Sequence, residues 1–321
     1  MGEVYLASDD ELGRRAAIKV LGSKHLTNPT VKERFLREAR ALAGLSHPNV
    51  IPVFESGQVG RPPRPYYAME LLEGGDTQKL LDERGPLPSG VVAVIGAQAA
   101  TGLGEAARAQ LIHRDVKPSN LGISRQGVLK VTDFGLAKMS SVDQKLTGKG
   151  LVVGTADYIA PEQARGEEVD ERADVYALGC TLFHLLTGHP PFRSSQPTPA
   201  QQFVEVMRAH VGSPIPDPRR DAPAADSELA QVIMLMMAKE REQRPAFSEA
   251  APLLSRIALR LGGELPRVSR QIFTVPFGTP ILPEQRPESG RLPSQRWRTL
   301  AAFAALVFSA VALMLSLWHQ R

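Results

Sequence analysis

Cysteine is nearly absent from this chain: its 321 residues include only Cys180. A single cysteine excludes a framework of internal disulfides and indicates a reducing compartment. The first 15 residues also lack the basic segment followed by an apolar segment that a secretion signal requires.

A basic excess is also missing from most of the chain. The formal charge of +4 arises after Leu261, where seven arginines and three glutamates stand without a lysine, so residues 1–261 are neutral. A nucleic-acid-binding domain normally carries a basic excess of its own. We therefore expect no nucleic-acid partner.

The C-terminal residues 299–318, TLAAFAALVFSAVALMLSLW, contain no charge. As a helix, twenty residues span roughly 30 Å, the thickness of the bilayer hydrocarbon. Trp297 and Trp318 stand at the two ends, and arginines accumulate before the segment rather than after it. This pattern predicts a single membrane-spanning helix with its N-terminal side in the cytoplasm and a tail of residues 319–321. A buried core helix is the alternative.

The remaining chain divides by composition. Six prolines in residues 262–298 predict an extended linker next to the membrane. Apolar runs and helical periodicity predict an α+β body. Its first part has strands at 4–7, 16–21, 50–54 and 66–71 with a helix at 31–45, and its second part has long helices at 91–109, 173–186, 200–210, 228–238 and 249–261.

One short segment, HRDVKPSN at 113–120, holds several groups that phosphoryl transfer requires. This reaction needs a base for the attacking hydroxyl, a cation on the phosphates and metal ions that neutralise charge. Asp115 is a suitable base, Lys117 can reach the transferred phosphate, and Asn120 offers an oxygen to a hard cation. Asp133 of the DFG segment 133–135, after an apolar run at 128–131, adds a carboxylate for Mg²⁺.

HRDVKPSN, followed by DFG and then by APE at 160–162, resembles the protein kinase superfamily. Lys117 two residues after Asp115, and the string GTADYIAPEQ at 154–163, are similar to the bacterial eukaryotic-like (Hanks-type) Ser/Thr kinases. The resemblance implies a two-lobed protein kinase fold. Residues 1–72 would form a small antiparallel lobe with helix αC, and residues 73–261 a larger, mainly helical lobe. It also implies ATP and Mg²⁺ (or Mn²⁺) as cofactors and Ser or Thr residues of proteins as acceptors.

The resemblance assigns further nucleotide contacts in the first lobe. Lys19, in the strand motif that begins at Ala17, would contact the phosphates and pair with Glu38 of helix αC. Gly2 and Val4 would belong to the glycine-rich loop over the phosphates.

The segment that joins the lobes is expected to bind the base. Met69 matches the gatekeeper position, and the backbone of Glu70 and Leu72 would bond the adenine.

Other matched residues are expected to be structural or regulatory. Asp174 would brace the catalytic loop, and Arg244 would pair with Glu162. The complete set of such residues is His113, Arg114, Phe134, Gly135, Thr155, Glu162, Asp174 and Arg244.

Arg114 next to Asp115 predicts control by phosphorylation, because a phosphate on the activation loop could pair with Arg114 and order the segment. Ser140, Ser141 and Thr147 are the candidates, and we favour Thr147.

The sequence departs from the family pattern at its start. Of the motif G-x-G-x-x-G-x-V only Gly2-Glu3-Val4 is present, so the first strand is missing and a sheet edge is exposed. Either translation starts upstream of Met1, or the chain is a genuine truncation with weakened ATP binding.

A second departure is Gly122, where relatives usually have Leu as the floor under adenine, so that some ATP affinity would be lost. These departures leave two alternatives to an active kinase open: a membrane-anchored pseudokinase scaffold, or an inactive fragment of a longer kinase. A homodimer through the C-terminal helix is also open.

Overall fold

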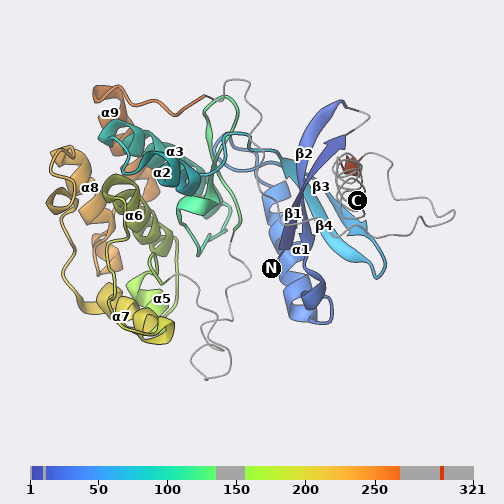
Figure 1. Ribbon diagram of the computed structural model, residues 1–321, viewed down its shortest axis with the longest axis horizontal. Coiled ribbons are helices and arrows are strands. Elements are labelled where there is room, and N and C mark those ends of the chain that lie inside the picture. The colour runs from blue at the N-terminus through green and yellow to red at the C-terminus, as the bar shows by residue number, and fades with distance from the viewer. Residues whose placement is uncertain (1, 10–11, 135–155, 268–296, 300–321) are drawn as a thin grey trace, which may run out of the picture. The chain divides into compact units, whose positions relative to one another are not determined.

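The computed structural model describes residues 2–9, 12–134, 156–267 and 297–299 (Figure 1). The chain forms two compact units. The first comprises described residues within 1–33, 53–71 and 274–321, and the second those within 34–52 and 72–273. Helix α1, Pro29–Ala43, begins in the first unit and continues in the second. A sheet unit and a mainly helical unit confirm the predicted α+β class.

The first unit is an antiparallel sheet with the strand order β3-β4-β2-β1-β7. Its strands are β1 Gly2–Asp9, β2 Arg14–Leu21, β3 Val53–Val59, β4 Arg64–Glu70 and β7 Trp297–Thr299. Alternating side chains bury Ala7, Ile18, Val20 and Ala68 in one small core. The turn between β1 and β2 is held by buried Asp9, whose carboxylate accepts from Leu12 N and Arg14 Nε, both at 3.2 Å.

β3 differs from the sequence prediction for residues 50–54. It begins only at Val53 and extends through polar residues to Val59, so apolar alternation could not have revealed it. The preceding residues belong to the second unit instead. Ile51 N donates to Val131 O at 3.0 Å, and Val131 N donates to Asn49 O at 2.8 Å.

The edge of the sheet at β1 is partly covered by β7, whose residues pair as Ala7 with Thr299 and Asp9 with Trp297. The sequence predicts that residues 297–298 end the linker and that Thr299 starts the membrane helix, whereas the structure has all three residues in β7. An edge strand presents unpaired N–H and C=O groups, which is the physical reason for a further segment to add there. Residues 300–318 of the expected span lie outside the described residues.

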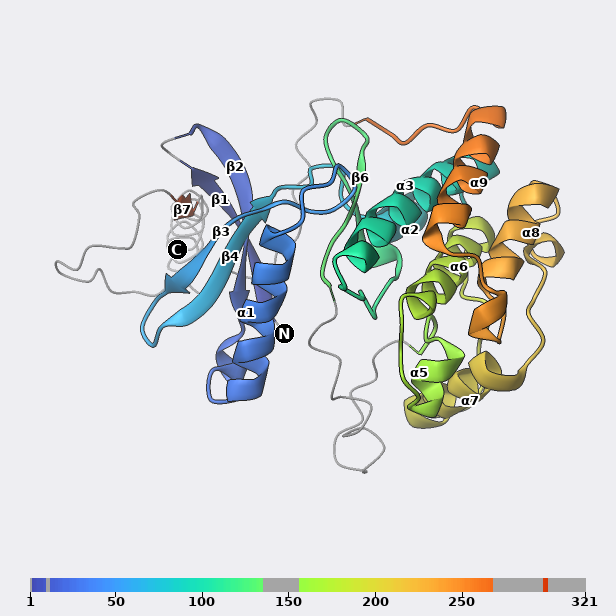
Figure 2. The same cartoon turned by 180° about the vertical axis from the view of Figure 1, so that it is seen from behind.

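The second unit is mainly helical (Figure 2). Its helices are α2 Thr77–Arg84, α3 Ser89–Arg108, α5 Pro161–Arg165, α6 Arg172–Thr187, α7 Pro199–Gly212, α8 Ser227–Met236 and α9 Phe247–Arg260. The 3₁₀ turns are Ser23–His25 in the first unit and Pro118–Asn120, Pro218–Arg220 and Arg241–Gln243 in the second. The short strands β5 Leu121–Ile123 and β6 Leu129–Val131 form a hairpin.

Helix α6 carries the core of the second unit. It packs against α3 and α8, and α3 packs in turn against α9. Nearly all its side chains are buried, including Cys180, whose thiol pKa is raised by burial. Among the described residues, α3 alone is long and apolar enough to cross a membrane. With 61% of its most apolar window buried inside the domain, it has the character of a core helix.

Candidate active site

The catalytic segment lies between α3 and β5 of the second unit. Lys117 Nζ lies 3.2 Å from Asp115 Oδ2. Asn120 Nδ2 donates to Asp115 O at 2.8 Å and lies 3.3 Å from Asp115 Oδ2. The structure therefore brings the proposed base, the phosphate-binding lysine and the amide ligand together around one carboxylate. The side chain of Asp115 is 16% exposed, which leaves it accessible to a substrate hydroxyl.

His113 orients this segment through both ring nitrogens. Nδ1 accepts from Asp115 N at 3.2 Å, and Nε2 lies 2.8 Å from Thr132 O. A carbonyl oxygen can only accept, so the ring is neutral with its proton on Nε2. The ring also packs on Phe134, with centroids 4.6 Å apart. His113 is fully buried, so its role is to position Asp115 rather than to react.

Asp174 at the start of α6 braces the same loop. Its two carboxylate oxygens accept from His113 N and Arg114 N, each at 2.7 Å. Burial raises the pKa of Asp174 to about 7. The two N–H donors and the Arg114 guanidinium lower this pKa, but their effect is smaller than that of burial. The predicted bracing contact is present, and it joins residues some sixty positions apart in the sequence.

Two residues of the candidate site adopt left-handed backbone conformations. Arg114 has φ +64° and Asp133 has φ +53°. Such conformations cost of order 1 kcal/mol or more in non-glycine residues and persist only where the surroundings enforce them. Here the Asp174 brace holds Arg114.

Asn120 and Asp133 are the groups expected to hold a metal ion. Because Nδ2 of Asn120 donates to Asp115 O, the amide turns its Oδ1 away from that bond and keeps an acceptor for a cation. No cluster of three or more His, Cys, Asp or Glu occurs among the described residues. Two protein ligands completed by phosphate and water oxygens suit Mg²⁺, which seldom uses an all-protein cage.

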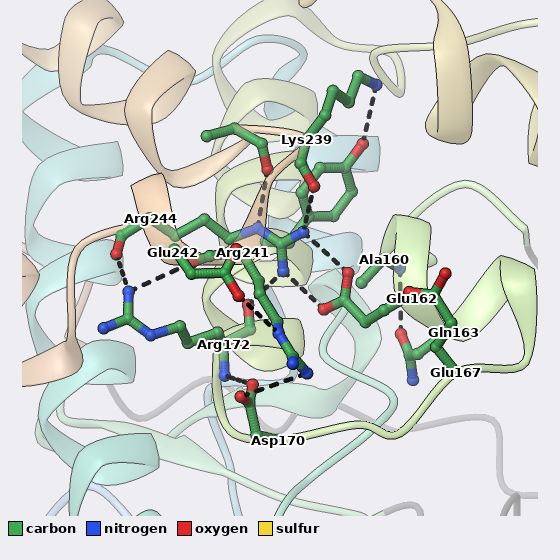
Figure 3. A network of polar contacts seen from close by, with 12 residues as sticks. Ala160, Glu162, Gln163, Glu167, Asp170, Arg172, Lys239, Arg241, Glu242 and Arg244 are labelled. Carbon is green, nitrogen blue, oxygen red and sulfur yellow. Dashed lines mark hydrogen bonds and ion pairs between the residues drawn. The ribbon is translucent and has the colours of Figure 1, made fainter.

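Arg244 and Glu162 form the predicted pair, deep in the second unit (Figure 3). The guanidinium bonds both carboxylate oxygens, at 2.6 and 2.8 Å. Its other N–H groups donate to Ala238 O, Arg172 O and Lys239 O at 2.8–3.0 Å, so all five donors are satisfied. The pair ties α5, at the end of the activation segment, to the region before α9.

One face of the sheet carries four of the expected nucleotide residues of the first unit: Val4, Ala17, Lys19 and Met69. Val4 pairs with Lys19 and Ala17 with Met69, and alternate residues of a strand lie on the same side. Lys19 is 9% exposed, and its Nζ lies 5.5 Å from the ring centroid of Tyr67 on β4.

The other first-unit residues lie at the ends of strands. A Cβ on Gly2 would lie 2.9 Å from Val20 O, so glycine lets β1 begin close to β2. Glu70 ends β4.

Glu38 and Leu72 belong to the second unit. Glu38 is buried on α1, and its pairing with Lys19 of the first unit stays a prediction. Gly135, Thr147 and Thr155 lie outside the described residues.

Two supporting residues were missed in the sequence. Thr132 accepts from His113 through its carbonyl and bonds Asn120 O through both N (2.9 Å) and Oγ1 (3.2 Å). Its place directly before Asp133 was the only available signal. Arg172 donates to the carbonyls of Arg241 and Arg244, and no motif marked it.

Comparison with known families identifies the class. A model of the protein kinase domain matches residues 1–252, and this chain belongs to that family. Within the family it is a domain of the bacterial Hanks-type Ser/Thr kinases, as the relatives below show.

The serine/threonine-protein kinase PknB of Mycobacterium leprae is 37% identical over 273 residues, which cover 84% of this chain and 42% of the relative. PknB of Mycolicibacterium smegmatis is 40% identical over 248 residues, 76% of this chain and 39% of the relative. The DNA damage-responsive serine/threonine-protein kinase RqkA of Deinococcus radiodurans is 38% identical, with 80% and 38% covered. The chain thus spans about two fifths of the length of these relatives.

Among solved structures, the kinase domain of Mycobacterium tuberculosis PknI matches with a TM-score of 0.59 and 28% identity. The match covers 82% of this chain and 91% of that domain. The kinase fold is therefore supported by structure as well as by sequence.

Proposed function

We propose that this domain transfers the γ-phosphoryl group of MgATP to Ser and Thr hydroxyls of protein substrates. The observation that carries the proposal is the arrangement of Lys117 and Asn120 around the Asp115 carboxylate. Such a set supplies a base, a cation and a metal ligand, which are the parts that phosphoryl transfer needs.

Each residue has a distinct task in the proposed reaction. Asp115 accepts the proton of the substrate hydroxyl, and Lys117 neutralises charge on the transferred group. Asn120 and Asp133 would hold Mg²⁺, which offsets phosphate charge when bound. Lys19 would bind the phosphates from the first unit.

The proposed location of the protein at a membrane rests on the sequence. The uncharged segment 299–318 and the arginines before it support a single-pass membrane protein with a cytoplasmic kinase domain, acting in membrane-associated signalling. The printed names of the relatives support protein Ser/Thr substrates.

Incorporation of radiolabelled phosphate from ATP into a protein substrate tests the activity. Asp115→Asn removes the base but keeps the shape of the side chain, and we expect activity to fall roughly 100-fold or more. Asp82→Asn, the same change at an exposed site on α2, is the matched control. Equal incorporation by the parent chain and Asp115→Asn would refute the assigned base.

A pseudokinase scaffold is the second candidate, favoured by Gly122. It requires nucleotide or partner binding with no phosphate incorporation by the parent chain.

Control by phosphorylation at Thr147 completes the proposal and rests on Arg114 beside the base. Thr147→Ala should lower both the phosphate content of the protein and its activity. If both stay unchanged, another residue or no phosphorylation controls the enzyme.

A further inference from the structure

Residues 73–75, which follow β4, are hydrogen-bonded to the edge of β5 that does not pair with β6. Gly74 N donates to Ile123 O at 2.9 Å, and Ile123 N donates to Gly75 O at 2.8 Å. An ion pair between Arg125 Nε and Glu73 Oε2 at 2.7 Å adds a side-chain contact. The position of Leu72, directly before this segment, is therefore set by the second unit itself.

Leu72 occupies the space into which a side chain at position 122 would point. A Cβ on Gly122 would overlap Leu72 Cδ1 and would lie 3.5 Å from both Leu72 Cγ and Thr132 Cγ2. Any side chain at 122 would force Leu72 into another rotamer. The glycine and the leucine are thus two halves of one packing arrangement.

The space that Leu72 fills at position 122 is bordered by Thr132, which contacts the proposed metal ligand Asn120. Thr132 Cγ2 lies 3.5 Å from a Cβ at position 122, and Thr132, which directly precedes Asp133, donates to Asn120 O through N (2.9 Å) and Oγ1 (3.2 Å). Leu72 is only partly buried, so apolar surface remains accessible at the start of β5, which directly follows Asn120. A ligand whose phosphates lie near Asn120 would extend its base along this surface.

We propose that the Leu72 side chain provides the apolar surface against which the purine base of the nucleotide packs, in place of a side chain at position 122. Gly122 is then required because Leu72 fills its space, and the loss of affinity expected from this glycine is offset by the leucine. This inference rests on the proposed function, since it assigns the base-binding part of the same site. The flat, apolar face of a purine suits contact with a branched aliphatic side chain.

Calorimetric titration of the full chain with MgADP tests whether Leu72 takes the place of a side chain at position 122 in binding the purine. Leu72→Ala should weaken binding about tenfold, within the range expected for uncovering part of a buried leucine contact. Gly122→Leu alone should also weaken binding, because Leu72 is displaced. The double variant Leu72→Ala/Gly122→Leu should recover most of the affinity, because the side chain is moved from one position to the other.

Leu235→Ala, the same truncation at an exposed leucine of α8, should leave the affinity unchanged and is the matched control. The thermal midpoint of each variant without nucleotide reports folding. Gly122→Ala replaces Gly122→Leu if the larger residue prevents folding.

The outcomes separate this inference from the proposed function. Unchanged MgADP affinity in Leu72→Ala, together with phosphate transfer by the parent chain, overturns the role of Leu72 alone. Leu72-dependent binding without any phosphate transfer supports Leu72 and overturns the proposed activity. Failure of the parent chain to bind MgADP overturns both.

Discussion

The two units hold their charged pairs in different ways. In the sheet unit, Arg64 Nη2 lies 2.6 Å from Glu3 Oε2, with side chains 23% and 42% exposed. In the helical unit, Arg244 and Glu162 are 0% and 4% exposed. Arg64 donates to one carboxylate oxygen and to Leu21 O, whereas all five donors of Arg244 are engaged.

The difference in burial indicates how much stability each unit loses when one partner of its ion pair is removed. Water can replace a partner of Arg64, but nothing can replace a partner of the buried Arg244 guanidinium. Glu3 of β1 is thus held by a weak and screened contact, while α5 is held by a buried pair whose partners water cannot replace.

Glu162→Ala should produce the largest loss of stability. It leaves the Arg244 guanidinium buried without its counter-ion, which typically costs about 3–5 kcal/mol. Urea unfolding of the parent and variant chains measures the effect. A loss below about 1 kcal/mol would show that the buried pair resembles the exposed one, and the comparison would fail.

Asp174→Asn should have the next largest effect. An amide accepts from one of the two backbone N–H groups but turns its own NH2 toward the other, so we expect a loss of about 2 kcal/mol. Because the contact positions the catalytic loop, kcat should fall while the KM for ATP changes less. A stable variant with normal kcat would contradict the assigned bracing role.

Acid should destabilise the helical unit. Burial lowers the pKa of His210 to about 3 and that of His184 to about 4. Below pH 6.5 the unfolded chain binds protons on these two histidines that the folded chain does not, so their contribution to stability is complete above 6.5 and falls as the pH drops toward these values. Asp174, whose pKa burial raises to about 7, binds a proton in the folded chain first and opposes part of this loss. The slope is at most about 1.4 kcal/mol per pH unit for a fully buried histidine.

Urea unfolding at pH 7 and pH 5 measures this loss. His210→Gln, which does not titrate, should reduce the difference between the two conditions. An unchanged difference would assign the acid sensitivity to other groups.

Arg64→Gln should have the smallest effect, below about 1 kcal/mol, and 1 M salt should reduce it further. Arg64 holds the pKa of Glu3 below its usual range. Unfolding at two salt concentrations measures the contribution, and Glu3→Gln should not add to it, because both changes remove the same pair. A large, salt-independent loss would place this pair in the same class as Glu162 and Arg244.

The sequence predicted those parts of the site whose residues lie close together along the chain. Asp115, Lys117 and Asn120 are close in sequence, so their spacing alone placed them in one loop. Long helices were also predicted within a few residues, because each shows apolar periodicity over several turns. β3 was misplaced, because its second half is polar and is held by pairing with β4.

Contacts between distant residues were decided only by the tertiary structure. Family resemblance suggested that Arg244 meets Glu162, 82 positions away, but the complete set of carbonyl partners became visible only in the fold. The pairing of β7 with β1 and the filling of the Gly122 space by Leu72 had no local signal. Sequence patterns report which groups are present and which face of an element is apolar. The neighbour that fills a given space depends on how separate elements pack, which no single segment encodes.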